Sequence, residues 1–192
     1  IGHTECDNTT ASAAVDAGAD VITHLFNAMP SIHHRKPGPV PPMLTDSRVV
    51  CELISDGVHL APDVIRMAML SAGPKRIALV TDAMSATGQP DGDYILGSLP
   101  VKVVDGRARL LDADGSLGAI AGSTLTMGRA VEFVTSVVGI PLGQVAVMAA
   151  TTPAKLHGLD EVGVIEEGHW ADLCLTDAKG HLVRVIHRGE AV

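Results

Sequence analysis

Histidine and aspartate side chains follow four short apolar runs of this sequence. His3, His24 and His59 each come after such a run, and Asp82 follows the run from Ile77 to Val80. Neutral imidazoles from neighbouring strands can bind one divalent metal ion, and a catalytic metal site keeps a position open for water. A carboxylate beside that water can act as a general base. The four residues together therefore predict a hydrolytic metal site.

The remaining histidines have a simpler interpretation. A single histidine after a strand is more often a hydrogen-bonded structural residue than a ligand, and this interpretation is adopted for His157, His169, His181 and His187. His33 and His34 lie beside charged residues and prolines, which favours a solvated loop. The carboxylates of Asp56 and Asp63 are interpreted as local caps.

The four runs must be positioned by a regular framework. Short apolar strands are predicted at the first three residues, at 20–23, at 49–54 and at 77–80, and each is followed by a helical or loop segment. A helix is predicted over 9–17, capped by Asp7 or Asn8 and closed by Gly18, and a second one opens at Pro62. Alternating strands and helices indicate a parallel α/β arrangement, so the polar strand ends face one side.

The pattern changes after about residue 91. A β-hairpin with an Asp105-Gly106 turn is predicted over 101–111. Ser123 is predicted to cap the longest helix, which runs to about Val138, and further helices are expected over 142–150 and from Thr152. The tail is predicted to form another hairpin over 172–186.

Composition excludes several classes of function. Aromatic residues make up 2% and the net charge is −8, so neither a stacking platform nor a basic surface for nucleic acid is expected. Three cysteines without metal-site spacing fit a reducing cytoplasm. No run of about 18 apolar residues is present that could cross a membrane. Because the first residue is Ile1, inside a strand-like phrase, the chain is interpreted as a fragment.

Several phrases resemble the amidohydrolase superfamily and, within it, the N-acetylglucosamine-6-phosphate deacetylase family. They are Gly2-His3-Thr4, the residues from Thr23 to Met29, those from Asp56 to His59, Val80 to Ala83, Ala121 to Ser123, and Gly163 to Leu173. The most specific is His-Leu-Phe-Asn-Ala-Met, at 24–29. The resemblance implies hydrolysis of the acetamide of N-acetyl-D-glucosamine 6-phosphate to D-glucosamine 6-phosphate and acetate, in amino sugar catabolism or cell-wall recycling.

The same resemblance implies roles for individual residues. His3 and His24 would bind the metal, most simply one or two Zn²⁺ ions, and Asp82 would be the catalytic proton carrier. His59 would contact the sugar or orient the scissile amide. The other implied substrate-binding residues are Asn27 and Ala28 at the phosphate, Arg35 reaching the neighbouring active site of a homodimer, and Ile120, Ala121 and Gly122 in a lining loop.

The resemblance also implies a fold. Residues 1–160 correspond to the C-terminal half of a metal-dependent (β/α)8 amidohydrolase (TIM) barrel, with the hairpin near 100–111 as an insertion, and residues 161–192 to the last strands of a small β domain. A complete barrel takes about 250 residues. A missing N-terminal part is therefore expected to supply a glutamate and other metal ligands, and the chain alone is predicted to be inactive.

Two alternatives stay open. Another amidohydrolase, such as an N-acyl amino acid hydrolase or a cyclic amidase, would share His3, His24 and Asp82 but would not need a phosphate grip. A non-catalytic module of the same fold is a possibility of a different class, which the presence of these three residues disfavours.

Overall fold

A three-stranded parallel sheet forms the centre of the computed structural model, which describes residues 1–192. Its order is β1 (Val21–Ile22), β2 (Val50–Ile54) and β3 (Ile77–Val80). The first residues extend it, because the amino group of Ile1 donates to the Val21 carbonyl at 2.7 Å and the Thr23 amide donates to the Ile1 carbonyl at 2.9 Å. The predicted parallel arrangement is confirmed.

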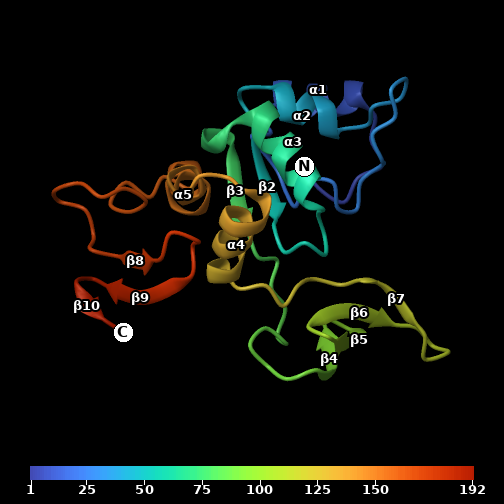
Figure 1. The fold of residues 1–192 in the computed structure, drawn as a ribbon. Coiled ribbons are helices and arrows are strands. Elements are labelled where there is room, and N and C mark those ends of the chain that lie inside the picture. Colours follow the sequence, from blue (N-terminus) through green and yellow to red (C-terminus); the bar gives the residue numbers. More distant parts are fainter.

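A helix follows each of the first three strand-like segments, whereas β3 leads into a loop, and the sequence predicted such a mixture of helical and loop segments (Figure 1). In α1 (Asn8–Asp16) the Asp7 side chain accepts the Thr10 amide at 2.8 Å. The proline-rich segment forms only the short α2 (Val40–Thr45), and α3 (Pro62–Ala72) begins at a proline and ends before Gly73. A 3-10 turn (Pro74–Arg76) then leads into β3.

The main core lies between one face of this sheet and the helices. Along β2 the side chains alternate, so Cys51 and Leu53 are fully buried among the helices whereas Glu52 points to the other face and is half-buried. On that other face the Thr23 hydroxyl donates to the Glu52 carboxylate at 2.7 Å. The sheet thus carries an apolar face and a partly polar one.

A separate four-stranded antiparallel sheet contains the predicted hairpin (Figure 1). Its strands are β4 (Gly92–Leu96), β5 (Leu99–Val104), β6 (Arg107–Leu111) and β7 (Leu117–Ile120). Asp105 and Gly106 both have positive φ, 51° and 69°, as a two-residue hairpin turn requires. Only the hairpin was predicted, whereas β4 and β7 are additional strands of this sheet. Both are mostly exposed and contain glycine, so their sequences lack a clear alternation of apolar and polar residues.

The helix predicted to begin at Ser123 begins later. In α4 (Met127–Phe133), which continues as a π-helical turn (Val134–Val138), the cap is Thr126, whose side chain accepts the Arg129 amide at 3.4 Å. The predicted Ser123 cap was wrong. Ser123 instead pairs with the segment that follows β3. Its amide donates to the Asp82 carbonyl at 2.8 Å, and its hydroxyl donates to the Thr81 carbonyl.

The last third of the chain forms a helical run and a small sheet. α5 (Leu142–Ala146), a π-helical turn (Val147–Thr151) and α6 (Thr152–Leu156) follow one another without a gap. The predicted tail hairpin is confirmed in β8 (Leu173–Thr176) and β9 (Leu182–His187), beside which β10 (Glu190–Ala191) pairs. Among the helices, none has both the length and the apolar character needed to cross a membrane.

Arg76 joins the helical layer to the sheet. Its guanidinium donates to five backbone carbonyls. Two of these bonds, to Met43 and Ser71, are 3.5 Å long, and the three shorter ones go to Leu44 at 2.6 Å, Asp46 at 2.7 Å and Val49 at 3.1 Å. The three carbonyls with the shorter bonds lie at the end of α2 and just before β2, where helical and ladder hydrogen bonding is interrupted. The Arg76 side chain therefore hydrogen-bonds the backbone that connects α2 to β2.

We predict that Arg76→Met lowers the free energy of unfolding by about 2–4 kcal/mol, because it removes the hydrogen bonds of a guanidinium to several partly buried carbonyls. Arg48→Met is the matched control: Arg48 is an exposed arginine that pairs with Asp16 and Asp46, and its loss should change stability only slightly. Chemical denaturation of both variants tests this. Equal effects of the two substitutions would contradict the assigned role of Arg76.

Candidate active site

Three of the four predicted strand-end residues have a left-handed backbone. The φ angles are 44° at His3, 31° at His24 and 49° at Asp82. Non-glycine residues rarely adopt this conformation, and such strain is concentrated at functional sites, where the surrounding structure holds it in place. The chain thus turns sharply as it leaves the sheet and presents an imidazole or a carboxylate at each turn.

His3 and His24 form a contacting pair. Their ring centroids are 4.7 Å apart with an interplanar angle of 77°. Close approach of the first segment to β1 makes this possible, since a Cβ on Gly2 would lie 2.2 Å from Cγ2 of Thr23. A residue larger than glycine at position 2 would push the two strand ends apart.

A divalent metal fits this pair. His24 is 9% exposed, and its Nδ1 atom is buried without any hydrogen-bond partner. Buried polar atoms normally have a hydrogen-bond partner, and this imidazole nitrogen has none. A metal ion or a hydrogen-bond donor could be its partner. The chain contains no group of three or more potential metal ligands close together. It therefore offers the imidazole part of a site and not a complete set of ligands.

Asp82 lies beside the predicted substrate-lining loop. Asp82 is exposed, and its backbone carbonyl accepts the Ser123 amide. Gly122, at φ 62°, passes so close that a Cβ there would lie 3.3 Å from the Asp82 carbonyl oxygen. Ile120 is exposed whereas Ala121 is 7% exposed and packs into the core of the four-stranded sheet. The structure thus brings Gly122 to Asp82, and it directs Ala121 away from solvent.

The predicted phosphate-binding residues lie in a tight turn after His24. The Asn27 side chain donates to the His24 carbonyl at 3.1 Å, and Phe26 and Ala28 have φ angles of 78° and 51°. The Ala28 carbonyl accepts the Thr4 amide at 3.0 Å, which ties this turn to the segment after His3.

Arg35 lies apart from that turn. It is exposed, and one of its guanidinium nitrogens lies 2.6 Å from Nε2 of His34. His33 and His34 contact each other, with ring centroids 4.4 Å apart. No hydrogen bond connects Arg35 with Asn27 or Ala28 within the chain.

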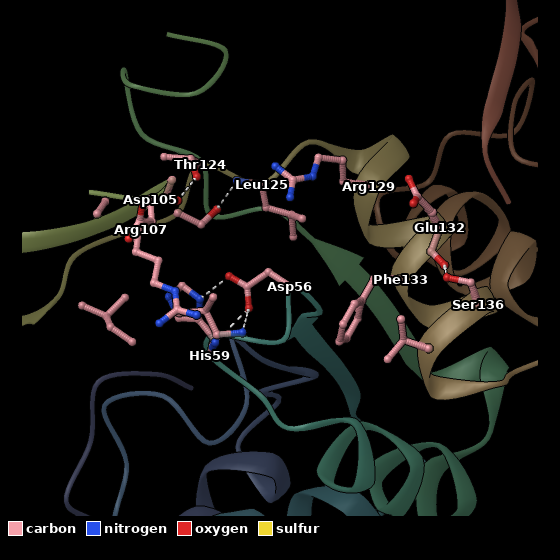
Figure 2. A pocket seen from close by; sticks show the side chains of 17 residues that line it. Asp56, His59, Asp105, Arg107, Thr124, Leu125, Arg129, Glu132, Phe133 and Ser136 are labelled. Carbon is pink, nitrogen blue, oxygen red and sulfur yellow. Dashed lines mark hydrogen bonds and ion pairs between the residues drawn. The ribbon is translucent and has the colours of Figure 1, made fainter. Parts of the chain in front are cut away.

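A cavity of about 340 Å³ adjoins this edge of the sheet (Figure 2). It is enclosed by the turn from Asp56 to His59, by the four-stranded sheet and by α4. Of the predicted site residues, His59, Ile120 and Gly122 line it, whereas His3, His24 and Asp82 do not. The structure therefore separates the predicted residues into a histidine pair and a cavity, with Asp82 next to the loop that borders the cavity.

His59 is held by Asp56. Oδ1 of Asp56 accepts the amides of Val58 and His59, each at 2.8 Å, and Oδ2 lies 2.7 Å from Nδ1 of His59. The side chains of His59 and Asp56 are only 8% and 12% exposed. Burial raises the pKa of Asp56, but the hydrogen bonds from the His59 ring and the two amides outweigh it, so the pKa is lowered.

Sequence reasoning missed several residues of this cavity. Asp56 was interpreted as a cap, although its carboxylate also orients an imidazole. Arg107, Arg129 and Phe133 line the cavity as well, and they come from elements far apart in the sequence. A signal was available at Gly57: at φ 75° a Cβ would lie 2.7 Å from the Phe133 ring, so Asp-Gly-Val-His is a turn that needs glycine.

Comparison with known proteins places this geometry in a family. The chain is 36% identical to an N-acetylglucosamine-6-phosphate deacetylase of Vibrio furnissii, over 100% of this chain and 47% of that protein. It is also 36% identical to an N-acetylgalactosamine-6-phosphate deacetylase of Escherichia coli O157:H7, over 99% of this chain and 49% of that protein.

Solved structures agree with the sequence relatives. The N-acetyl-D-glucosamine-6-phosphate deacetylase of Mycobacterium smegmatis, in complex with N-acetyl-D-glucosamine-6-phosphate, superposes with a TM-score of 0.91 at 42% identity, covering 100% of this chain and 50% of that one. The chain thus spans about half the length of these relatives. The model of the amidohydrolase family (Amidohydro_1) matches residues 1–192, so the chain belongs to the amidohydrolase family.

Proposed function

We propose that this chain is the C-terminal half of a (β/α)8 deacetylase that hydrolyses the acetamide of N-acetyl-D-glucosamine 6-phosphate. The observation that carries the proposal is the strained backbone at His3, His24 and Asp82, which places two imidazoles and a carboxylate at the same edge of a parallel sheet. Amide hydrolysis at such an edge needs a proton carrier and a group that polarises the substrate, and these residue types can provide both.

His3 and His24 would hold a divalent ion, for which we propose zinc. When bound, such an ion polarises a carbonyl oxygen and lowers the pKa of a bound water. A catalytic zinc site usually has three protein ligands. We therefore propose that an N-terminal part of the same protein supplies at least one more, because the relatives extend over about twice the length of this chain.

Asp82 is the proposed catalytic residue. Its carboxylate would accept a proton from the attacking water and deliver it to the amine that leaves with the sugar. The exposed position and the left-handed backbone leave the carboxylate accessible at the strand end, while hydrogen bonds of the adjoining backbone to Ser123 fix its place.

The sugar phosphate would be bound in the turn after His24. Asn27 is positioned there by its own hydrogen bonds, and the Ala28 backbone would donate to the phosphate. Arg35, which is exposed and has no hydrogen bond to Asn27 or Ala28 in its own chain, would reach the phosphate in the neighbouring subunit of a homodimer. Its planar fork suits bidentate contact with a phosphate. The loop from Ile120 to Gly122 and His59 would border the sugar.

Asp82→Asn is predicted to reduce kcat for deacetylation by roughly 100- to 10,000-fold, because an amide cannot carry the proton. Acetate release by the complete protein measures this. Asp63→Asn is the matched control, since Asp63 is an exposed carboxylate in the first turn of α3 that pairs with Arg66. Unchanged turnover in Asp82→Asn would contradict the assigned role of Asp82, whereas a complete wild-type protein that releases no acetate would support the non-catalytic alternative.

The phosphate grip predicts that N-acetylglucosamine is hydrolysed far more slowly than its 6-phosphate, and that Arg35→Met raises KM for the phosphorylated sugar by about tenfold or more. Equal rates with and without the phosphate would point to another amidohydrolase, such as an N-acyl amino acid hydrolase. N-acetylgalactosamine 6-phosphate belongs in the same assay, because relatives named for each sugar share 36% identity with the chain.

A further inference from the structure

We propose that Asp56 is a positioning residue that fixes the neutral His59 ring with its proton on Nδ1, so that Nε2 faces the cavity as a hydrogen-bond acceptor. Both side chains line the cavity, and Figure 2 shows Asp56 bonded to His59 at its wall. The nature of the ligand rests on the proposed function, whereas the protonation of the ring does not.

The hydrogen-bonding capacity of Asp56 determines which nitrogen of His59 carries the proton. Its lowered pKa keeps the carboxylate ionised near neutral pH, and an ionised carboxylate only accepts. One oxygen is already taken by the amides of Val58 and His59. The other lies 2.7 Å from Nδ1 of His59, so Nδ1 must carry a proton. In a neutral imidazole the remaining nitrogen, Nε2, is then an acceptor.

The tail of the chain contains the same arrangement with a different outcome. Oδ1 of Asp177 accepts the amides of Lys179 and His181, and Oδ2 lies 2.7 Å from Nδ1 of His181. Nε2 of His181, however, lies 3.3 Å from the Glu132 carboxylate, so both ring nitrogens face acceptors. The hydrogen bond to Asp177 and the two nearby carboxylates raise the pKa of His181. In the tail, carboxylates thus lie beside both ring nitrogens and favour the protonated imidazole.

His59 differs at its second nitrogen. No hydrogen bond or ion pair to Nε2 of His59 is present in the structure, although the side chain is 8% exposed. The other charged groups that line the cavity are Asp105 and Arg107 of the four-stranded sheet and Arg129 and Glu132 of α4, and none of them bonds to the ring. Nε2 is therefore left for a ligand.

This tautomer restricts what His59 can bind. The sequence left two roles open, contact with the sugar or orientation of the scissile amide. An acceptor at Nε2 cannot donate to the acetamide carbonyl oxygen, but it can receive a sugar hydroxyl or an N–H group. The structure thus excludes a hydrogen bond from His59 to the acetamide carbonyl oxygen and leaves a sugar hydroxyl or the acetamide N–H group as its partner.

Nitrogen NMR of ¹⁵N-histidine-labelled protein tests the inference directly. Across a pH series of the wild type, the neutral form of the His59 ring should show a protonated Nδ1 and an unprotonated Nε2. A proton on Nε2 would overturn the inference without any variant. This readout needs no turnover, so it is independent of whether the protein is a deacetylase.

Asp56→Asn should reverse the tautomer. The Asn oxygen would keep the two amide hydrogen bonds, which turns the NH₂ group toward Nδ1 and leaves the proton of His59 on Nε2. The fold should persist, because the shapes of the two side chains are the same. For the sugar phosphate, KM should rise on the order of tenfold with a smaller change in kcat, since an acceptor of the substrate has become a donor.

Asp177→Asn is the matched control, because it alters the same arrangement at the surface. It should change the resonances of His181 only and leave those of His59, KM and kcat as in the wild type. An Asp56→Asn protein that retains the proton on Nδ1 would contradict the inference. A reversed tautomer with unchanged KM would show that His59 does not contact the substrate, and would overturn that part of the proposal.

Discussion

The carboxyl edge of the parallel sheet imposes the constraint on which the rest of the structure depends. Its short strands are buried against helices on one side, so on that side the chain carries polar side chains where the strands end. At His3, His24 and Asp82 it leaves the strand through a left-handed backbone conformation that costs conformational energy. The close packing of Gly2 against Thr23 and the hydrogen bonds of Ser123 to Thr81 and Asp82 hold these turns in place.

The four-stranded sheet inserted after β3 is coupled to this edge through its last strand. Ser123 follows β7 and pairs with the extension of β3, so the insertion returns to the strand end from which it departed. As a result, the loop from Ile120 to Gly122 and the hairpin at Arg107 form walls of the cavity that also contains His59. Loops carry specificity in α/β enzymes because they vary while the strands stay fixed.

The strand ends could be predicted from the sequence because β-branched runs and the polar residues after them are local signals. Ser123 was misassigned for a related reason: a serine before an apolar run favours a cap, but its tertiary contact with Asp82 takes precedence. The role of Asp56 could not be predicted because it depends on the distance between its carboxylate and the His59 ring. The position of Arg107 at the cavity depends in the same way on the sheet topology. Neither is encoded in spacing alone.

His3 and His24 are proposed to bind a catalytic metal beside the Asp82 carboxylate. Zinc K-edge X-ray absorption of the complete, zinc-loaded protein tests this most directly. We expect a shell of nitrogen and oxygen ligands at about 2.0–2.2 Å with imidazole scattering. That scattering should weaken in His24→Ala. A zinc–sulfur distance of about 2.3 Å, or an unchanged spectrum in His24→Ala, would contradict it.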